Sequence, residues 1–422
     1  MTDTATLAKK PLAPGLNRDD ARSAAREVRK RRLQAFLFVT PLLIFILFSF
    51  VAPITTMLYR SVYNPTVADL LPDTLVALRG WEQSDERPSD AVLTQFAIDL
   101  KRLANDRTSG RLADEINRAL PGMSSVVKST ARAVRRVDDA ELAANGPALL
   151  IDANDRWAEP ETWRAIKDAG RAYSLDYYLT SLDLERGSAG EIQARDTQIY
   201  VKLYTKTLWM ALIITVATVL LGYPLAYFMA NTSTSLSNAL MVFVLLPFWT
   251  SLLVRTTAWI ALLQTNGVVN STLQAFGLRD DPLELLYTQF STIIAMTHIL
   301  LPFMVLPLYS VMRGIDSSYM RAAMSMGSRP LAAWFRIYLP MSLPGLSAGA
   351  LLVFIISVGY YITPALVGGT DGQMISNIIA FHMQQSNNWE LAAALGALLL
   401  LLILVLYWLF DRFVGAANIK LG

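Results

Sequence analysis

Six long apolar runs constrain the fold of this chain more than any other feature of its sequence. They cover approximately residues 35–59, 204–230, 239–263, 290–312, 343–367 and 391–413. Each is long enough to cross a bilayer core of roughly 30 Å, which takes about 20 helical residues. None alternates apolar and polar residues as a barrel strand does. The runs therefore predict an all-α membrane protein with six transmembrane helices.

The composition supports a membrane protein and argues against an enzyme. The chain is 53% hydrophobic and only 17% charged, which is too apolar for an ordinary soluble protein. It contains no cysteine, and its two histidines, His298 and His382, have no second ligand at a useful spacing. No glycine-rich phosphate-binding motif is present. We therefore expect no catalytic residue, no metal site and no cofactor.

Charge at the ends of the apolar runs predicts the orientation of the chain. Residues 1–34 contain nine basic and four acidic residues, and the run Arg29–Arg32 directly precedes the first apolar run. Such a flank is typical of the cytoplasmic side of a membrane. A nucleic-acid-binding arm is the alternative, but a membrane span so close behind makes nucleic acid an unexpected partner. Both termini, with Arg412 and Lys420 at the second, are thus expected in the cytoplasm.

This orientation divides the chain into four regions. Residues 1–34 form a cytoplasmic segment, 35–59 the first span, 60–203 an insertion outside the membrane, and 204–422 a core with five further spans. The loop 313–342 of this core is expected on the cytoplasmic side.

The insertion shows helical spacing. Residues Val92, Phe96 and Leu100 fall on one helical face, and "PETWRAIKDAG" starts with proline and ends with glycine. We expect a small, mostly helical extracytoplasmic domain. It is either a docking or lid surface or a decoration without function, and the sequence leaves both open.

One charged residue, Arg255, lies well inside an apolar run. A charge in lipid is costly unless it faces protein or water, so Arg255 is a candidate functional residue. The alternative is that its side chain snorkels to the membrane surface. Trp249 and Trp259 flank it and could equally be interfacial tryptophans.

The cytoplasmic loop contains the segment "RAAMSMGSRPLAAWFRIYLP", residues 321–340. Residues 319–326 are expected to form a short helix that presents Ala322 and Ala323 and ends at Gly327. A second helix should begin at Pro330 and end at Leu339-Pro340. The arrangement suits a protein docking site, although an interfacial loop with basic residues on lipid headgroups would look similar.

This segment resembles the "EAA" loop of permease subunits of binding-protein-dependent ABC importers, with the pattern E-A-A-x(3)-G-x(9)-I-x-L-P. Arg321 stands where that pattern has its glutamate. The matching positions are Ala322, Ala323, Gly327, Ile337, Leu339 and Pro340.

The segments "LPFWTSLLVRTTAWIALLQTNGVVNSTLQAFGL" and "PGLSAGALLVFIISVGYYITPALVGG" resemble the spermidine/putrescine branch of this family. The resemblance covers the first span and about residues 200–415. Tyr360 stands where an acid is expected, and the insertion is longer than the corresponding loop of that branch.

The resemblance implies a permease of the bacterial inner membrane that moves a small solute inward by alternating access. Its implied partners are ABC ATPase subunits, which hydrolyse ATP separately, a second permease or second copy, a periplasmic binding protein and the lipid membrane. The implied cargo is a polyamine such as spermidine or putrescine. Iron complexes, thiamine-like molecules and opine or amino-acid derivatives remain alternatives, as does a membrane receptor or secondary carrier with an outer sensory domain.

The resemblance also implies roles for two groups of residues. Coupling to the ATPase is expected at Arg321, Ala322, Ala323 and Gly327, with Ile337, Leu339 and Pro340 attaching the loop to the fifth span. A substrate pathway, or alternatively packing, is expected at Trp249, Arg255, Tyr360, Tyr361 and Thr363.

Overall fold

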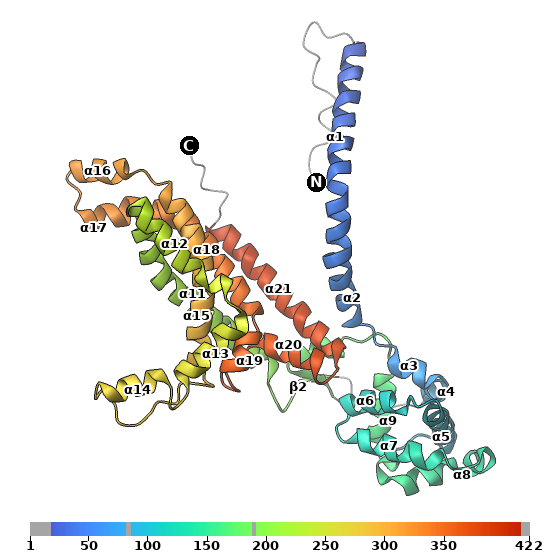
Figure 1. Ribbon diagram of the computed structural model, residues 1–422. Helices are drawn as coiled ribbons and strands as arrows, with labels where there is room; N and C mark the ends of the chain where they lie inside the picture. Colours follow the sequence, from blue (N-terminus) through green and yellow to red (C-terminus); the bar gives the residue numbers. More distant parts are fainter. Residues whose placement is uncertain (1–17, 82–85, 188–190, 415–422) are drawn as a thin grey trace. The chain divides into compact units, whose positions relative to one another are not determined.

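The computed structural model describes residues 18–81, 86–187 and 191–414 (Figure 1). The first half of the expected cytoplasmic segment, residues 1–17, and Lys420 therefore lie outside the described residues. The chain divides into two compact parts at Tyr59–Arg60, and each is described by itself.

The first part is one long helix made of three sections. These are α1 (Arg18–Ile46), the π-helical turn η2 (Leu47–Val51) and α2 (Ala52–Arg60). Pro53 lies two residues after the end of the π-helical turn, and the backbone N–H of Ala52 reaches back to the carbonyl of Leu47. A widened turn relieves the clash that a proline makes with the preceding helical turn. Within this part, the most apolar stretch of residues 30–60 has no buried residue.

The second part begins with a mostly helical segment. Its helices are α3 (Thr66–Leu70), α4 (Pro72–Ala77), η3 (Leu78–Gly80), α5 (Asp90–Asn105), α6 (Ser109–Ala119), α7 (Met123–Val134), α8 (Asp139–Ala153), η4 (Asp155–Ala158), α9 (Pro160–Ala169) and α10 (Asp176–Ser181). A small antiparallel hairpin follows, in which β1 (Leu184–Arg186) pairs with β2 (Ile192–Ala194) through Glu185 opposite Gln193.

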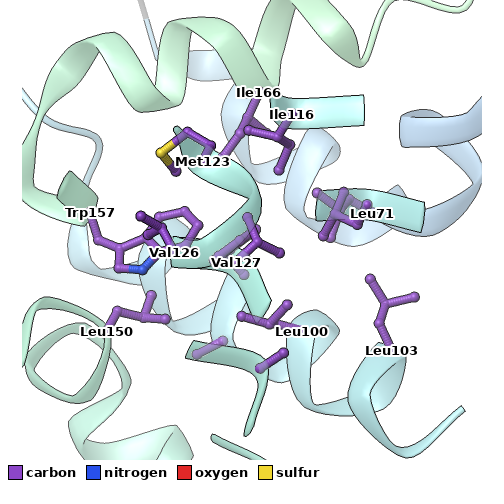
Figure 2. Close-up of a cluster of buried hydrophobic side chains, with 14 of the residues drawn as sticks. Leu71, Leu100, Leu103, Ile116, Met123, Val126, Val127, Leu150, Trp157 and Ile166 are labelled. Carbon is purple, nitrogen blue, oxygen red and sulfur yellow. The ribbon is translucent and has the colours of Figure 1, made fainter. Parts of the chain in front are cut away.

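This insertion has a hydrophobic core of its own (Figure 2). The Phe96 ring packs against Trp157 and Trp163, with ring centroids 4.8 and 5.3 Å apart. Both indole N–H groups are satisfied, because Trp157 Nε1 donates to Thr130 Oγ1 and Trp163 Nε1 donates to the Trp157 carbonyl, each at 2.9 Å. Large aromatic side chains with satisfied polar atoms are a strong source of core stability.

The membrane core follows the insertion. Its helices are α11 (Tyr200–Asn231), α12 (Thr234–Trp249), α13 (Leu252–Leu263), α14 (Val268–Ala275), α15 (Gln289–Arg313), α16 (Ser317–Ser325), α17 (Pro330–Ala333), the π-helical turn η5 (Trp334–Tyr338), α18 (Leu339–Gly359), α19 (Ile362–Val367), α20 (Ile375–Gln384) and α21 (Trp389–Val414).

Glycines allow α15 and α18 to approach closely at the centre of this core. A Cβ added to Gly345 would lie 2.9 Å from the Pro307 carbonyl oxygen, and one added to Gly349 would lie 2.9 Å from Met304 Sδ. Close backbone approach at small residues is a general means of packing helices in membranes, where the hydrophobic effect does not drive helix association.

The span expected over residues 239–263 is not one continuous helix. The chain bends by 97° between α12 and the following helical segment, with the break at Thr250-Ser251. Pro247 leaves the end of α12 one hydrogen bond short, and the Thr250 hydroxyl donates to the Pro247 carbonyl at 3.0 Å. Among the described residues, five helices are long and apolar enough to cross a membrane, or six if this bent pair is one span.

The expected helix over residues 343–367 is also interrupted. The helix α18 ends at Gly359, α19 begins at Ile362, and Tyr360 and Tyr361 lie between them. The spans expected at 204–230, 290–312 and 391–413 correspond to α11, α15 and α21.

Polar contacts join the insertion to the ends of two core helices. The buried carboxylate of Asp183 accepts the backbone N–H groups of Ile199, Tyr200 and Val201, at 2.8–3.1 Å, and so caps α11. Arg118 of α6 donates to the carbonyl of Asn387 at 2.7 Å, just before α21.

Candidate functional site

The loop 313–342, which the sequence predicts on the cytoplasmic side, begins with a capped helix. The side chain of Asp316 accepts the backbone N–H of Ser318 at 2.8 Å and so caps the first turn of α16. Hydrogen bonds from the backbone and the hydroxyl of Ser318 hold the pKa of the Asp316 carboxyl below its usual value. The Asp316 carboxylate therefore stays ionised, and its negative charge interacts favourably with the positive N-terminal end of the α16 dipole.

Gly327 ends this helix through a left-handed turn. Its φ is +90°, the Ser328 N–H bonds the Ala323 carbonyl and the Gly327 N–H bonds the Met324 carbonyl, each at 3.0 Å. This pair of bonds defines a Schellman motif, which requires a residue that tolerates positive φ. The left-handed conformation expected at Gly327 is confirmed, although the helix covers Ser317–Ser325 rather than 319–326.

The outer surface of α16 differs from the expected alanine patch. Arg321 and Ala322 are exposed, whereas Ala323 is buried at 3% exposure. Because Ala323 faces the rest of the loop, only Ala322 of the two alanines is accessible to a partner. The exposed apolar side chains beside it are those of Tyr319, Met324 and Met326.

Leu339-Pro340 does not end the second helix, contrary to expectation. Helix continues through η5 into α18, so residues Pro330–Gly359 form one helix of 30 residues. The Leu339 N–H reaches back to the Trp334 carbonyl, which gives a widened turn before Pro340. A π-helical turn accommodates the proline ring without breaking the helix. The junction between the loop and the span α18 contains Ile337, Leu339 and Pro340.

An apolar groove of about 520 Å³ separates this loop from α11. Its lining comes from Tyr223, Pro224, Tyr227, Met320, Pro330, Leu331, Trp334 and Phe335. Leu331 and Phe335 are 75% and 60% exposed, so the apolar face of the second helix is only partly covered within the described chain.

At the end of the core away from α16 and α17, the two helix breaks bring α13 and α19 close together (Figure 1). The helix α13, which carries Arg255, packs against α19, which carries Thr363. Arg255 lies within electrostatic range of His298 and Tyr360, and its Nε is buried without a hydrogen-bond partner. Trp259 Nε1 donates to His298 Nδ1 at 3.3 Å. The described residues of α11–α13, α15, α18 and α19 include no Asp or Glu, so the charge of Arg255 is not neutralised there.

The break at Tyr360-Tyr361 is held by two side chains of α20. Ser376 Oγ donates to the Tyr360 carbonyl and Asn377 Nδ2 donates to the Tyr361 carbonyl, both at 2.7 Å. Backbone groups freed inside a membrane must find such partners, and broken helices of this kind line the pathways of many transporters.

The structure brings together Arg255, Tyr360 and Thr363 of the expected pathway residues. Trp249, at the end of α12, is 72% exposed, and the Tyr361 side chain is 38% exposed.

The chain matches known proteins over this core. Residues 222–417 fit the family described as "Binding-protein-dependent transport system inner membrane component". The spermidine/putrescine transport system permease protein PotB of Escherichia coli is 35% identical over 217 residues, which are 51% of this chain and 79% of PotB. This chain belongs to that permease family.

Other permeases match it similarly. PotB of Haemophilus influenzae is 32% identical over 220 residues, 51% of this chain and 77% of that protein. The inner membrane ABC transporter permease protein YdcU of E. coli is 31% identical over 261 residues, 58% of this chain and 81% of YdcU. Among solved structures, a bacterial ABC transporter involved in the import of the acidic polysaccharide alginate is 18% identical, with a TM-score of 0.43. The match covers 53% of this chain and 81% of the alginate transporter chain, and a TM-score this low supports no argument.

The permease is thus a multi-pass inner-membrane subunit of an ABC importer and not a catalytic enzyme. The loop 313–342 and the polar residues around Arg255 lie within the matched range of the permease, whereas the insertion lies outside it.

Sequence analysis of the permease missed Ser376 and Asn377. The only signal was two adjacent polar residues at the start of a short apolar helix. Their partners are backbone carbonyls, which no pattern of side chains reveals.

Proposed function

We propose that this permease, with a second permease or a second copy of itself and two ATPase subunits, forms the path by which an ATP-driven importer carries a polyamine into the cytoplasm. Its termini and the loop 313–342 lie in the cytoplasm, and the insertion lies in the periplasm with the binding protein. The identity with PotB permeases supports both the importer class and the cargo.

The observation that carries this proposal is the mechanical continuity of the cytoplasmic loop with a span. The loop consists of a short capped helix, a Schellman turn at Gly327 and the start of a continuous helix of residues 330–359. The Gly327 turn is therefore the one flexible joint between the described loop and α18. An ATPase that holds Arg321, Ala322 and Gly327 differently in its two states would therefore shift α18. Such differential contacts are what bias alternating access.

The polar residues around Arg255 form the permease's share of the substrate pathway in this proposal. Trp249, Tyr360 and Tyr361 present aromatic rings, and the faces of such rings attract organic cations. Because the described helices there contain no acid, we propose that the partner permease supplies the carboxylate that a polyamine needs.

The test is isolation of this chain from its native membrane together with its partners, followed by uptake in proteoliposomes. We expect an ATPase and a second permease to copurify, and ATP-dependent uptake of radiolabelled spermidine or putrescine when the binding protein is added. An active complex that takes up neither polyamine would reject the cargo alone. A chain that copurifies with no ATPase, under conditions that preserve known ABC importers, would reject the coupling mechanism.

A further inference from the structure

The hairpin of α6 and α7 in the insertion, with the residues that directly flank it, carries a row of exposed basic side chains. We call them the basic stripe; they are Arg107, Arg111, Lys128, Arg132, Arg135 and Arg136. The hairpin turns at Gly122, whose φ of +91° makes the two helices antiparallel neighbours.

One ion pair fixes the register of the basic stripe across the hairpin. Lys128 Nζ of α7 lies 3.2 Å from Asp114 Oδ1 of α6. Arg111 is three residues before Asp114 and Arg132 is four residues after Lys128, so both lie one turn further along the same face. Arg107, Arg135 and Arg136 continue the row at this end of the hairpin.

The positive charge of the stripe is largely uncompensated. Among the described residues, Lys128 is the one stripe member that forms an ion pair. Asp106 and Asp138 lie next to the stripe in sequence but make no ion pair with its arginines in the described part of the chain. Like charges on adjacent helical turns destabilise a helix, so the folded insertion gains nothing from them.

The fold of the hairpin does not need the stripe either. Its opposite face supplies Ile116, Met123 and Val127 to the core of the insertion (Figure 2). No large apolar side chain is exposed between residues 99 and 172. A surface that binds lipid usually adds aromatic or aliphatic side chains to its basic ones, so this stripe suits an acidic protein surface better than a membrane.

The hairpin is also fixed to the core. Arg118, on α6, pairs with Glu115 at 2.7 Å, lies 3.6 Å from Glu390 of α21 and donates to the Asn387 carbonyl. The hairpin that carries the stripe is thereby attached to the start of α21, where the insertion joins the core.

We propose that the basic stripe docks an acidic face of the importer's soluble binding protein and so delivers it to the permease. This inference rests on the proposed function. Complementary charge mainly accelerates encounter and fixes orientation, and its effect falls as salt screens it.

The experiment uses the complete complex in nanodiscs and the binding protein that stimulates its ATP hydrolysis. The variant is Arg111→Glu/Arg132→Glu, and the matched control is Arg79→Glu/Arg87→Glu, which reverses two exposed charges elsewhere on the insertion. The concentration of binding protein that gives half-maximal stimulation should rise about tenfold or more for the stripe variant at about 0.1 M salt, and the difference should shrink at about 1 M salt. Unstimulated ATP hydrolysis should not change.

Equal half-maximal concentrations for the stripe variant and wild type would overturn the docking inference while leaving the importer intact. An equal loss in the control would overturn it as well, because the effect would then be one of net charge. A loss that depends on phosphatidylglycerol in the nanodisc, and not on the binding protein, would assign the stripe to the membrane instead. A wild-type complex that no binding protein stimulates would instead reject the proposed function.

Discussion

At the scale of single residues, Gly327 and Arg255 are constrained for different reasons. Gly327 has a positive φ but open space around it, since a Cβ added there would meet no atom within 4 Å. Only backbone conformation therefore selects glycine there. Arg255 has ordinary backbone, and its constraint is an unneutralised charge with a buried, unpartnered Nε.

Gly327→Val should abolish transport while the complex still assembles. A β-branched residue at positive φ costs about 1–2 kcal/mol, which the exposed Schellman turn can avoid by rearranging. Gly327→Asn is the matched control, because asparagine tolerates the left-handed region and should retain most activity. ATP-dependent uptake and copurification of the ATPase measure the two properties. Full uptake by the valine variant would remove the turn from the coupling mechanism.

Arg255→Gln should lower the KM for polyamine uptake by several-fold. Removing a positive charge from the pathway removes its repulsion of a polycation in a site poorly screened by water. Arg255→Lys keeps the charge and should leave KM near the wild-type value. The KM is obtained from initial uptake rates measured over a range of concentrations of spermidine-loaded binding protein. A rise in KM for the glutamine variant would instead indicate that Arg255 contacts an acceptor group of the cargo.

At the scale of helices, the packing of α15 on α18 depends on glycine. Gly345→Val should reduce the free energy of unfolding by about 1–3 kcal/mol or more, because its side chain would collide with the Pro307 carbonyl and Val311. Gly396→Ala is the control, since a Cβ there meets open space. Thermal unfolding in detergent compares the two, and equal transition temperatures would show that α15 and α18 can separate without cost.

The sequence predicted helix lengths well and helix interruptions poorly. Apolar length alone identified α11, α15 and α21, because crossing lipid requires it. The breaks after Trp249 and Gly359 lie inside equally apolar runs, and side chains of Thr250, Ser376 and Asn377 bind backbone carbonyls there. Conversely, Pro340 was expected to end a helix, but the widened turn before it absorbs the proline.

The candidate sites were predictable to different degrees. The loop motif is local, so its glycine turn followed from spacing alone, while the burial of Ala323 depends on packing and did not. The electrostatic interaction between Arg255 and Tyr360 joins residues more than a hundred positions apart. No single-sequence pattern encodes that proximity.

At the scale of the whole molecule, the insertion and the core meet in a cluster of ionisable groups. The Glu115 carboxylate accepts hydrogen bonds from Arg118 and from Asn64 Nδ2, and Asn64 Nδ2 also donates to the Tyr177 hydroxyl. Burial raises the pKa of the Glu115 carboxyl, against the opposing effect of Arg118, and the negative charge of Glu390 adds to the rise. Burial also raises the pKa of Tyr177 to about 12, so that hydroxyl stays protonated.

Glu115→Gln should therefore stabilise the junction at neutral pH. A carboxyl whose pKa is raised on folding contributes stability that is present below its unfolded value, near 4.5, and is lost as pH rises through the folded value. The melting temperature of the variant should exceed that of wild type at pH 7, and the gap should close near pH 4. Asp114→Asn, at an exposed carboxyl of the same helix, is the control. If the difference in melting temperature between variant and wild type grew as the pH was lowered, the pKa of Glu115 would not be raised by folding.

In the coupling mechanism proposed above, the continuous helix of residues 330–359 transmits motion as a rigid rod. At 1.5 Å per residue its 30 residues extend about 45 Å, well beyond the hydrocarbon thickness of a bilayer. Tilting such a rod by about 10° about one end displaces the other by roughly 8 Å, given that length. The far end is the Tyr360 break. A small rotation of the loop would thus displace the Tyr360 end of α18 by a distance comparable to the width of a small solute, without any bending of α18.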